Sequence, residues 1–72
     1  MKFEPGKFYL HEMGRAIAVL GEVETYKWGK MLVIEETDVT GHSISCSDEG
    51  QDADEDFWIE IGNEEWLSHF RG

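Results

Sequence analysis

Three histidines, one cysteine and a short run of aspartates are the residues whose chemistry would suit a metal ion or a nucleophile. The nitrogen and sulfur groups that zinc prefers belong to His11, His42, His69 and Cys46. His42 and Cys46 share one face of an expected strand, but Ile44 separates them and no second ligand pair follows. We therefore predict no metal site. We interpret Cys46 as a small core residue, because free cysteine packs like an apolar side chain.

The acidic stretch Asp52-x-Asp54-x-Asp56 resembles the opening of an EF-hand calcium loop. That loop requires glycine at its sixth position and glutamate at its twelfth. Phe57 and Asn63 occupy those positions here, and no helix is expected before the loop. The motif fails where its geometry is most demanding, so we predict a solvated loop, with weak and non-specific divalent binding as the alternative.

The chain shows no catalytic motif. A Cys–His nucleophilic pair would need a pocket and an oxyanion hole, and a small barrel rarely has room for both. We predict no catalytic residues, no cofactor and no enzymatic activity. A small hydrolase or metal protein is the weakest of our hypotheses.

Aromatic side chains on expected exposed positions, beside acidic residues, point to a protein-binding surface. Tyr9 and Trp58 fall on the non-core phase of their strands, and Tyr26 and Trp28 fall at or next to a turn. Aromatics beside acidic loops form the peptide groove of SH3-like domains. The alternative is that Trp58 packs under a terminal helix and Trp28 covers a barrel end. The residues predicted to contact a partner are Tyr9, Tyr26, Trp28, Trp58, Asp52, Asp54 and Glu55.

The charge of the chain is strongly negative and unevenly spread. The net charge is −10 over 72 residues, and the interval 31–70 holds twelve of the sixteen acidic residues and none of the six basic ones. Direct binding to nucleic acid requires a basic footprint, so we exclude that class. An acidic surface keeps a small protein soluble and favours a basic protein partner. The like charge also opposes self-association, so we expect a monomer.

The length and the single cysteine limit the architecture and the compartment. We expect the 72 residues to form one small β-barrel domain, residues 1–72, and the single cysteine allows no intramolecular disulfide. No apolar run approaches the roughly 20 residues of a membrane span, and we expect no membrane association. A lone thiol without an apolar export signal predicts a reducing, cytoplasmic location.

The elements expected to position these residues are short strands joined by turns. In the second strand, Gly21 predicts a bulge or a sharp bend. The third is apolar on both faces, which predicts a central strand with a cover on its outer face. The expected strands are residues 7–11, 16 to about 26, 31–35, 42–47 and 57–61.

The alternation of residue types along the last two strands predicts which of their side chains point toward the core. We expect Ile44 and Cys46 to point inward, and we expect a core face of Phe57, Ile59 and Ile61. Between these strands, the loop 48–55 contains no apolar residue large enough to anchor it. We therefore predict that this loop is mobile on its own.

A short helix is expected to cover the sheet. Asn63 is a good helix cap, and an apolar stripe follows at Trp66, Leu67 and Phe70. We predict a mainly β fold: a small five-stranded antiparallel, partly open SH3-like barrel with a short C-terminal helix. The alternative is an open sheet with the helix across one face.

Three segments, which together span most of the chain, resemble segments of known proteins. They comprise turns, a bent strand and a strand–helix unit. They are Pro5-Gly6-Lys7-Phe8-Tyr9 with His11, Gly21-Glu22-Val23-Glu24-Thr25, and Trp58-x-Glu60-Ile61 with Glu64-Glu65-Trp66 and Phe70. Together they resemble small uncharacterised proteins encoded in bacterial phage and prophage genomes. The resemblance implies a phage-associated accessory role and assigns no catalytic or binding residue.

Two functions agree with these features. The first is a non-enzymatic protein-interaction module, phage-derived, that binds a protein partner through its aromatic and acidic surface. The second is an acidic DNA mimic, whose carboxylates would occupy the phosphate-binding groove of a nucleic-acid-binding protein. The long interval without basic residues motivates the second function.

Overall fold

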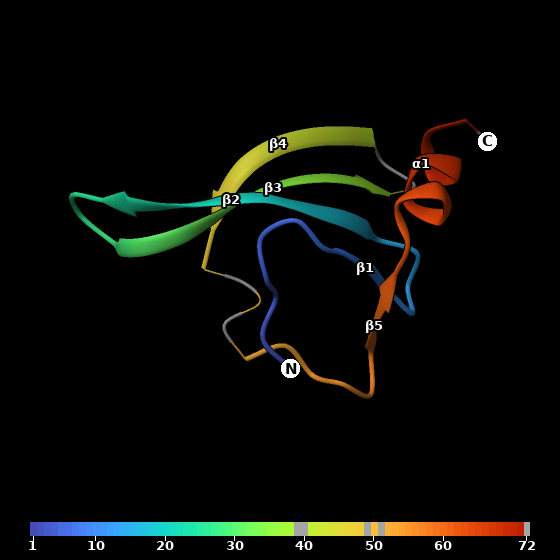
Figure 1. The fold of residues 1–72 in the computed structure, drawn as a ribbon, viewed down its shortest axis with the longest axis horizontal. Helices are drawn as coiled ribbons and strands as arrows, with labels where there is room; N and C mark the ends of the chain where they lie inside the picture. The colour runs from blue at the N-terminus through green and yellow to red at the C-terminus, as the bar shows by residue number, and fades with distance from the viewer. Residues whose placement is uncertain (39–40, 49, 51, 72) are drawn as a thin grey trace.

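The computed structural model describes residues 1–38, 41–48, 50 and 52–71, which form one antiparallel sheet and a C-terminal helix (Figure 1). The strands lie in the order β4-β3-β2-β1-β5, and in the described part of the chain the sheet does not close into a barrel. The mainly β, five-stranded antiparallel fold with a short helix is confirmed. The elements are β1 (Phe8–His11), β2 (Ala16–Thr25), β3 (Gly29–Asp38), β4 (Gly41–Ser47), β5 (Trp58–Ile61) and α1 (Asn63–Arg71).

A bulge divides β2 into two halves. Val19 pairs with Ile34 and the next pair is Gly21 with Val33, so Leu20 is an extra residue in β2. The bulge exchanges the faces of β2 beyond this point, which places Glu22 opposite the buried Leu32. The bulge predicted at Gly21 is therefore confirmed, and it accounts for the exposure of Leu20.

One face of the sheet carries an aromatic core that is completed by the N-terminal segment. Phe3 stacks on Tyr9, with ring centroids 4.2 Å apart, and makes a T-shaped contact with Trp58, with ring centroids 4.9 Å apart. Aromatic pairs prefer offset-stacked and edge-to-face arrangements. The cluster consists of Phe3, Tyr9, Ile17, Val19, Leu32, Ile34, Ala53 and Trp58, with Met1 packed against it.

The opposite face carries a second core under α1. Ala16 and Ala18 alternate along β2 with Ile17 and Val19, so the small side chains face the helix and the large ones face the aromatic core. The small alanines leave room for the indole of Trp66. The second cluster consists of Ala16, Ala18, Ile61 and Trp66, with Phe8, Leu10 and Leu67 packed against it.

The helix lies over β1 and β2, and this position overturns two predictions. The strand at the centre of the sheet is β2 rather than the 31–35 strand, whose Val33 is only half-buried. Ile44 is 60% exposed and Cys46 is exposed as well, so neither points inward. The side chain of Phe70 lies outside the described residues.

The predicted facing of β5 is also wrong in part. Ile61 is buried as expected, but Phe57 and Ile59 are 44% and 57% exposed, whereas Trp58 is buried. Trp58 pairs with His11 across β1 and β5, and its ring lies on the aromatic core. Ile59 faces the side of the sheet that α1 covers. It is exposed because it lies on β5, the edge strand, away from the centre of the core under α1.

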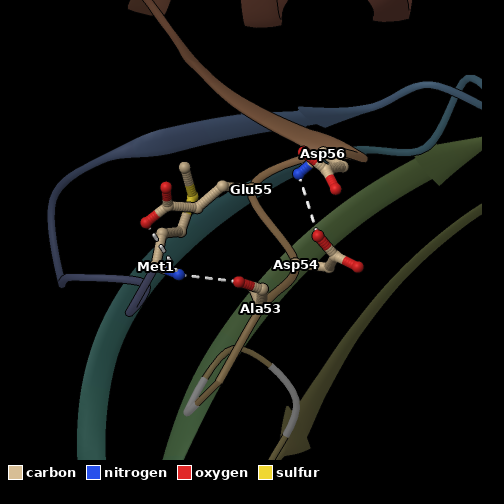
Figure 2. A network of polar contacts seen from close by, with 5 residues as sticks. All are labelled: Met1, Ala53, Asp54, Glu55 and Asp56. Atoms are coloured by element: carbon tan, nitrogen blue, oxygen red, sulfur yellow. Dashed lines mark hydrogen bonds and ion pairs between the residues drawn. The ribbon is translucent and has the colours of Figure 1, made fainter.

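The N-terminal segment and the loop before β5 are joined by main-chain hydrogen bonds. The Phe3 amide donates to Gly50 O and the Ala53 amide donates to Met1 O, both at 2.9 Å. The Met1 amino group donates to Ala53 O at 2.7 Å and lies 3.3 Å from the Glu55 carboxylate (Figure 2). Ala53 is buried, so the prediction of an unanchored loop is wrong for its described residues; positions 49 and 51 lie outside them.

No helix in the described ranges has the length and apolar character that crossing a membrane requires.

Gly50→Ala and Gly14→Ala form a matched pair that measures the packing of Phe3. The two glycines have nearly the same left-handed φ, +95° and +96°, so alanine costs about 1–2 kcal/mol of backbone strain at each. A Cβ at Gly50 would also overlap the Phe3 ring, whereas none of the neighbouring atoms is within 4 Å at Gly14. Urea denaturation should show Gly50→Ala less stable than Gly14→Ala by about 1–3 kcal/mol. Equal losses would contradict this packing.

Trp66→Ala should unfold the domain or nearly so. Truncating a buried aromatic side chain costs about 3–5 kcal/mol, which is most of the stability of a domain this small. The control is Trp28→Ala, which removes an exposed indole and should change the free energy of unfolding by less than about 0.5 kcal/mol. Circular dichroism and urea denaturation measure both, and similar effects of the two substitutions would refute the helix-side core.

Candidate functional site

The tip of the β2–β3 hairpin presents two exposed aromatic side chains. Tyr26 is fully exposed and Trp28 is 67% exposed. Thr25 orders the turn: its Oγ1 donates to Gly29 O at 2.8 Å and accepts from the Trp28 amide at 2.9 Å. Lys27 Nζ lies 4.9 Å from the centroid of the Trp28 ring, within cation–π range. The tip is therefore an ordered turn that holds Trp28 in place.

Tyr9 and Trp58, which were predicted to be exposed, are core residues. They are 2% and 6% exposed because Phe3 covers them. Tyr9 Oη accepts a hydrogen bond from the Glu4 amide at 2.9 Å, and the Arg15 guanidinium carbon lies 5.5 Å from the Trp58 ring centroid. Both side chains therefore stabilise the fold, and neither is available to a partner at the surface.

The acidic residues predicted to join the aromatics lie in the loop before β5. Asp52, Asp54 and Glu55 are all exposed. Asp54 Oδ1 accepts from the Asp56 amide at 2.9 Å, and Glu55 reaches the Met1 amino group (Figure 2). In Figure 1 this loop lies beside the N-terminus, whereas the hairpin tip projects at the far end of the long axis. The structure does not bring the seven predicted residues together.

The histidines and the cysteine lie in separate places. His42 Nε2 is 2.8 Å from Glu35 Oε2 on the outer part of the sheet, and Cys46 is exposed four residue pairs further along β4. His11 Nδ1 accepts from the Met13 amide at 3.1 Å, and its ring meets the edge of Trp58. Among the described residues, no group of three or more histidine, cysteine or acidic side chains is arranged to hold a metal ion.

Two of the basic residues are held by carboxylates. Arg15 binds Glu36 Oε2 through Nε at 3.0 Å and through Nη2 at 2.7 Å. Lys7 Nζ lies 3.1 Å from Glu4 and 3.5 Å from Glu60. The hydrogen bond to Glu4 and its negative charge, with a further contribution from Glu60, raise the pKa of Lys7 above its ordinary value.

A cavity of about 290 Å³, which the sequence did not indicate, opens where β1 ends and β5 begins, near the C-terminal end of α1. It is lined by the cross-strand pair Leu10 and Ile59, by the turn after β1, by the segment before β5 and by the helix end. Three stretches of the chain that are distant in sequence build it, so no local motif marks it. The lining residues are Leu10, His11, Glu12, Gly14, Asp56, Phe57, Ile59 and His69.

Comparisons with protein-family models, with curated proteins and with solved structures found no match. Any function proposed for this chain therefore depends on its own contacts and charges.

Tyr9→Phe tests the structural role of the Tyr9 hydroxyl. The substitution leaves the partly buried Glu4 amide without its acceptor, which should cost about 0.5–1.5 kcal/mol. Tyr26→Phe is the matched control, because the Tyr26 side chain is fully exposed and the same change should be neutral. Chemical denaturation of both variants gives the two free energies of unfolding. An unchanged value for Tyr9→Phe would show that the hydroxyl contributes nothing to the fold.

Proposed function

We propose that this protein is a non-enzymatic protein-interaction module whose contact surface is the tip of the β2–β3 hairpin. The observation that carries the proposal is the exposure of Tyr26 and Trp28 on an ordered turn. Tyrosine and tryptophan are enriched at protein interfaces and among the residues that contribute most to binding. The exposed part of the Trp28 indole offers apolar contact area to a partner.

The order of the turn supports this proposal. Association costs free energy when loops and side chains must be immobilised, and a preorganised surface lowers that cost. The two Thr25 hydrogen bonds and the contact of Lys27 with the Trp28 ring restrict the tip before any partner arrives. The hairpin also projects from the body of the molecule, which leaves its end accessible (Figure 1).

The charge of the molecule favours a basic partner. A net charge of −10 accelerates encounter with a positively charged protein and disfavours acidic ones. The phage-associated accessory role implied by the sequence resemblance and a cytoplasmic setting belong to this proposal. So does the relation to SH3-like domains, which rests on a five-stranded antiparallel sheet with a bulged second strand.

The second candidate is the acidic DNA mimic. It is favoured by the exposure of most carboxylates, while Arg15 and Lys7 are occupied by ion pairs. The exposed acidic residues include Glu12, Glu22, Glu24, Asp52, Asp54, Asp56, Glu64 and Glu65. In this case carboxylates rather than aromatics would carry the binding energy.

Substitution at the hairpin tip separates the two functions. A partner captured from bacterial lysate and then purified should bind Trp28→Ala at least tenfold more weakly than the parent protein, a loss of about 1.4 kcal/mol. Ile44→Ala, a change at an exposed apolar residue of β4, should leave the affinity unchanged. Calorimetry on the purified pair measures both.

The salt dependence of the same complex provides the second criterion. Contacts between exposed charges are screened within about 10 Å at 0.1 M salt, so a DNA mimic should lose most of its affinity as salt rises. Binding through Trp28 should persist. Affinity that falls steeply with salt and is indifferent to Trp28→Ala would replace the first proposal with the second.

A further inference from the structure

We propose that the cavity between β1, β5 and α1 is a binding site for a long basic side chain, lysine or arginine, of a protein partner. The site is separate from the hairpin tip and does not depend on it. Its volume, about 290 Å³, lies at the lower limit of ligand sites in proteins, which run from roughly 300 to 1,000 Å³. A cavity of this size holds one long side chain rather than a cofactor.

The floor of the cavity is apolar and suits an aliphatic stem. Leu10 and Ile59 are direct cross-strand partners, so their side chains lie next to each other on the helix side of the sheet. Phe57 adds a half-exposed aromatic ring, whose centroid lies 6.0 Å from that of His11. Lysine and arginine bury their methylene stems on such surfaces and keep the charged group in water.

The rim of the cavity is acidic. Glu12 and Asp56 both line it, and both are exposed. The Glu12 amide donates to Phe57 O at 2.9 Å, which fastens the turn after β1 to the residue that follows Asp56. The two carboxylates therefore start from main-chain segments that are joined by a hydrogen bond.

The charged residues that line the cavity favour a positively charged ligand. The lining residues of the described chain include two carboxylates and no lysine or arginine. The nearest arginine in sequence, Arg15, is bound to Glu36. A cation near the face of Phe57 would also be attracted by the ring. A side chain with an apolar stem and a positively charged end complements both the apolar floor and the acidic rim.

The walls of the cavity are held by the main chain. The His11 amide donates to Arg15 O at 2.8 Å and the Gly14 amide donates to His11 O at 2.9 Å, which closes the turn after β1. On the other side, Asp54 O accepts from the amides of Phe57 and Trp58 at 3.0 and 3.1 Å. The site is thus formed before a ligand arrives, which lowers the cost of binding.

Titration with blocked tripeptides tests the proposal by NMR of the labelled protein. The probes are acetyl-Ala-X-Ala-amide at pH 8, where X is lysine, arginine, norleucine or 2-amino-3-guanidinopropionate. Norleucine keeps the stem without the charge, and 2-amino-3-guanidinopropionate keeps a guanidinium charge with only one methylene of the stem. The lysine or arginine peptide should bind at least threefold more tightly than either, with shifts at the amides of Leu10, Gly14 and Ile59.

Charge-neutralising variants test whether the carboxylates at the rim cause the preference for a charged peptide. Glu12→Gln with Asp56→Asn should abolish the preference for lysine over norleucine. Glu64→Gln with Glu65→Gln, at the exposed start of α1, removes the same net charge outside the cavity and should keep that preference. Loss of the preference in both double variants would show a general charge effect and overturn the site.

A free amine tests whether the cavity binds a side chain of a protein partner or a small amine. Pentylammonium carries the stem and the charge of lysine without a peptide backbone. If pentylammonium binds the cavity and the lysine peptide does not, the cavity takes a small amine and the proposal of a partner side chain is wrong. Equal binding of all peptides, or shifts confined to β3 and β4, would also overturn it.

Discussion

The contact of Phe3 with Tyr9 and Trp58 is the interaction on which the rest of this structure depends. A five-stranded sheet this small has two faces to cover and one short helix to cover them with. The helix covers β1 and β2 on one side, and the N-terminal segment covers the other side through a single buried phenylalanine. The hydrogen bonds between residues 1–3 and the loop before β5 hold that ring in place. The first half of β2 is thereby buried on both faces, although the sheet does not close into a barrel in the described part of the chain.

The strands themselves could be predicted because turns and alternation are local properties of a sequence. The bulge near Gly21 and the start of α1 at Asn63 followed from the same kind of argument. The facing of Tyr9 and Trp58 could not be predicted, because it depends on which remote segment covers each face. Phe3 stood outside every predicted element, and nothing in its neighbourhood marks it as the residue that buries them. The exposure of Ile44 has the same origin, since the helix lies two strands away over β1 and β2.

The two candidate sites differ in the same way: one could be predicted from local sequence and the other could not. Tyr26 and Trp28 were found because a turn next to two strands exposes its residues whatever the rest of the fold does. The cavity was missed because its floor joins β1 to β5 and its rim joins a turn to a loop more than forty residues later. Asp56 belongs to the acidic run Asp54-Glu55-Asp56, whereas Glu12 has no acidic neighbour in the sequence. Their proximity arises from the pairing of β1 with β5, a long-range contact that charge patterning does not reveal.

The bonds between Met1 and Ala53 also have a consequence for how the chain folds. They join residues separated by 52 positions, whereas β2 and β3 meet across a tight turn. The entropy lost on closing a loop grows with the logarithm of its length, and folding slows as more contacts are remote in sequence. The β2–β3 hairpin is therefore favoured as an early structure, and the aromatic core forms only when the two distant segments meet. Until that step, half of the sheet has no cover, and the chain is at its most vulnerable to association with its own copies.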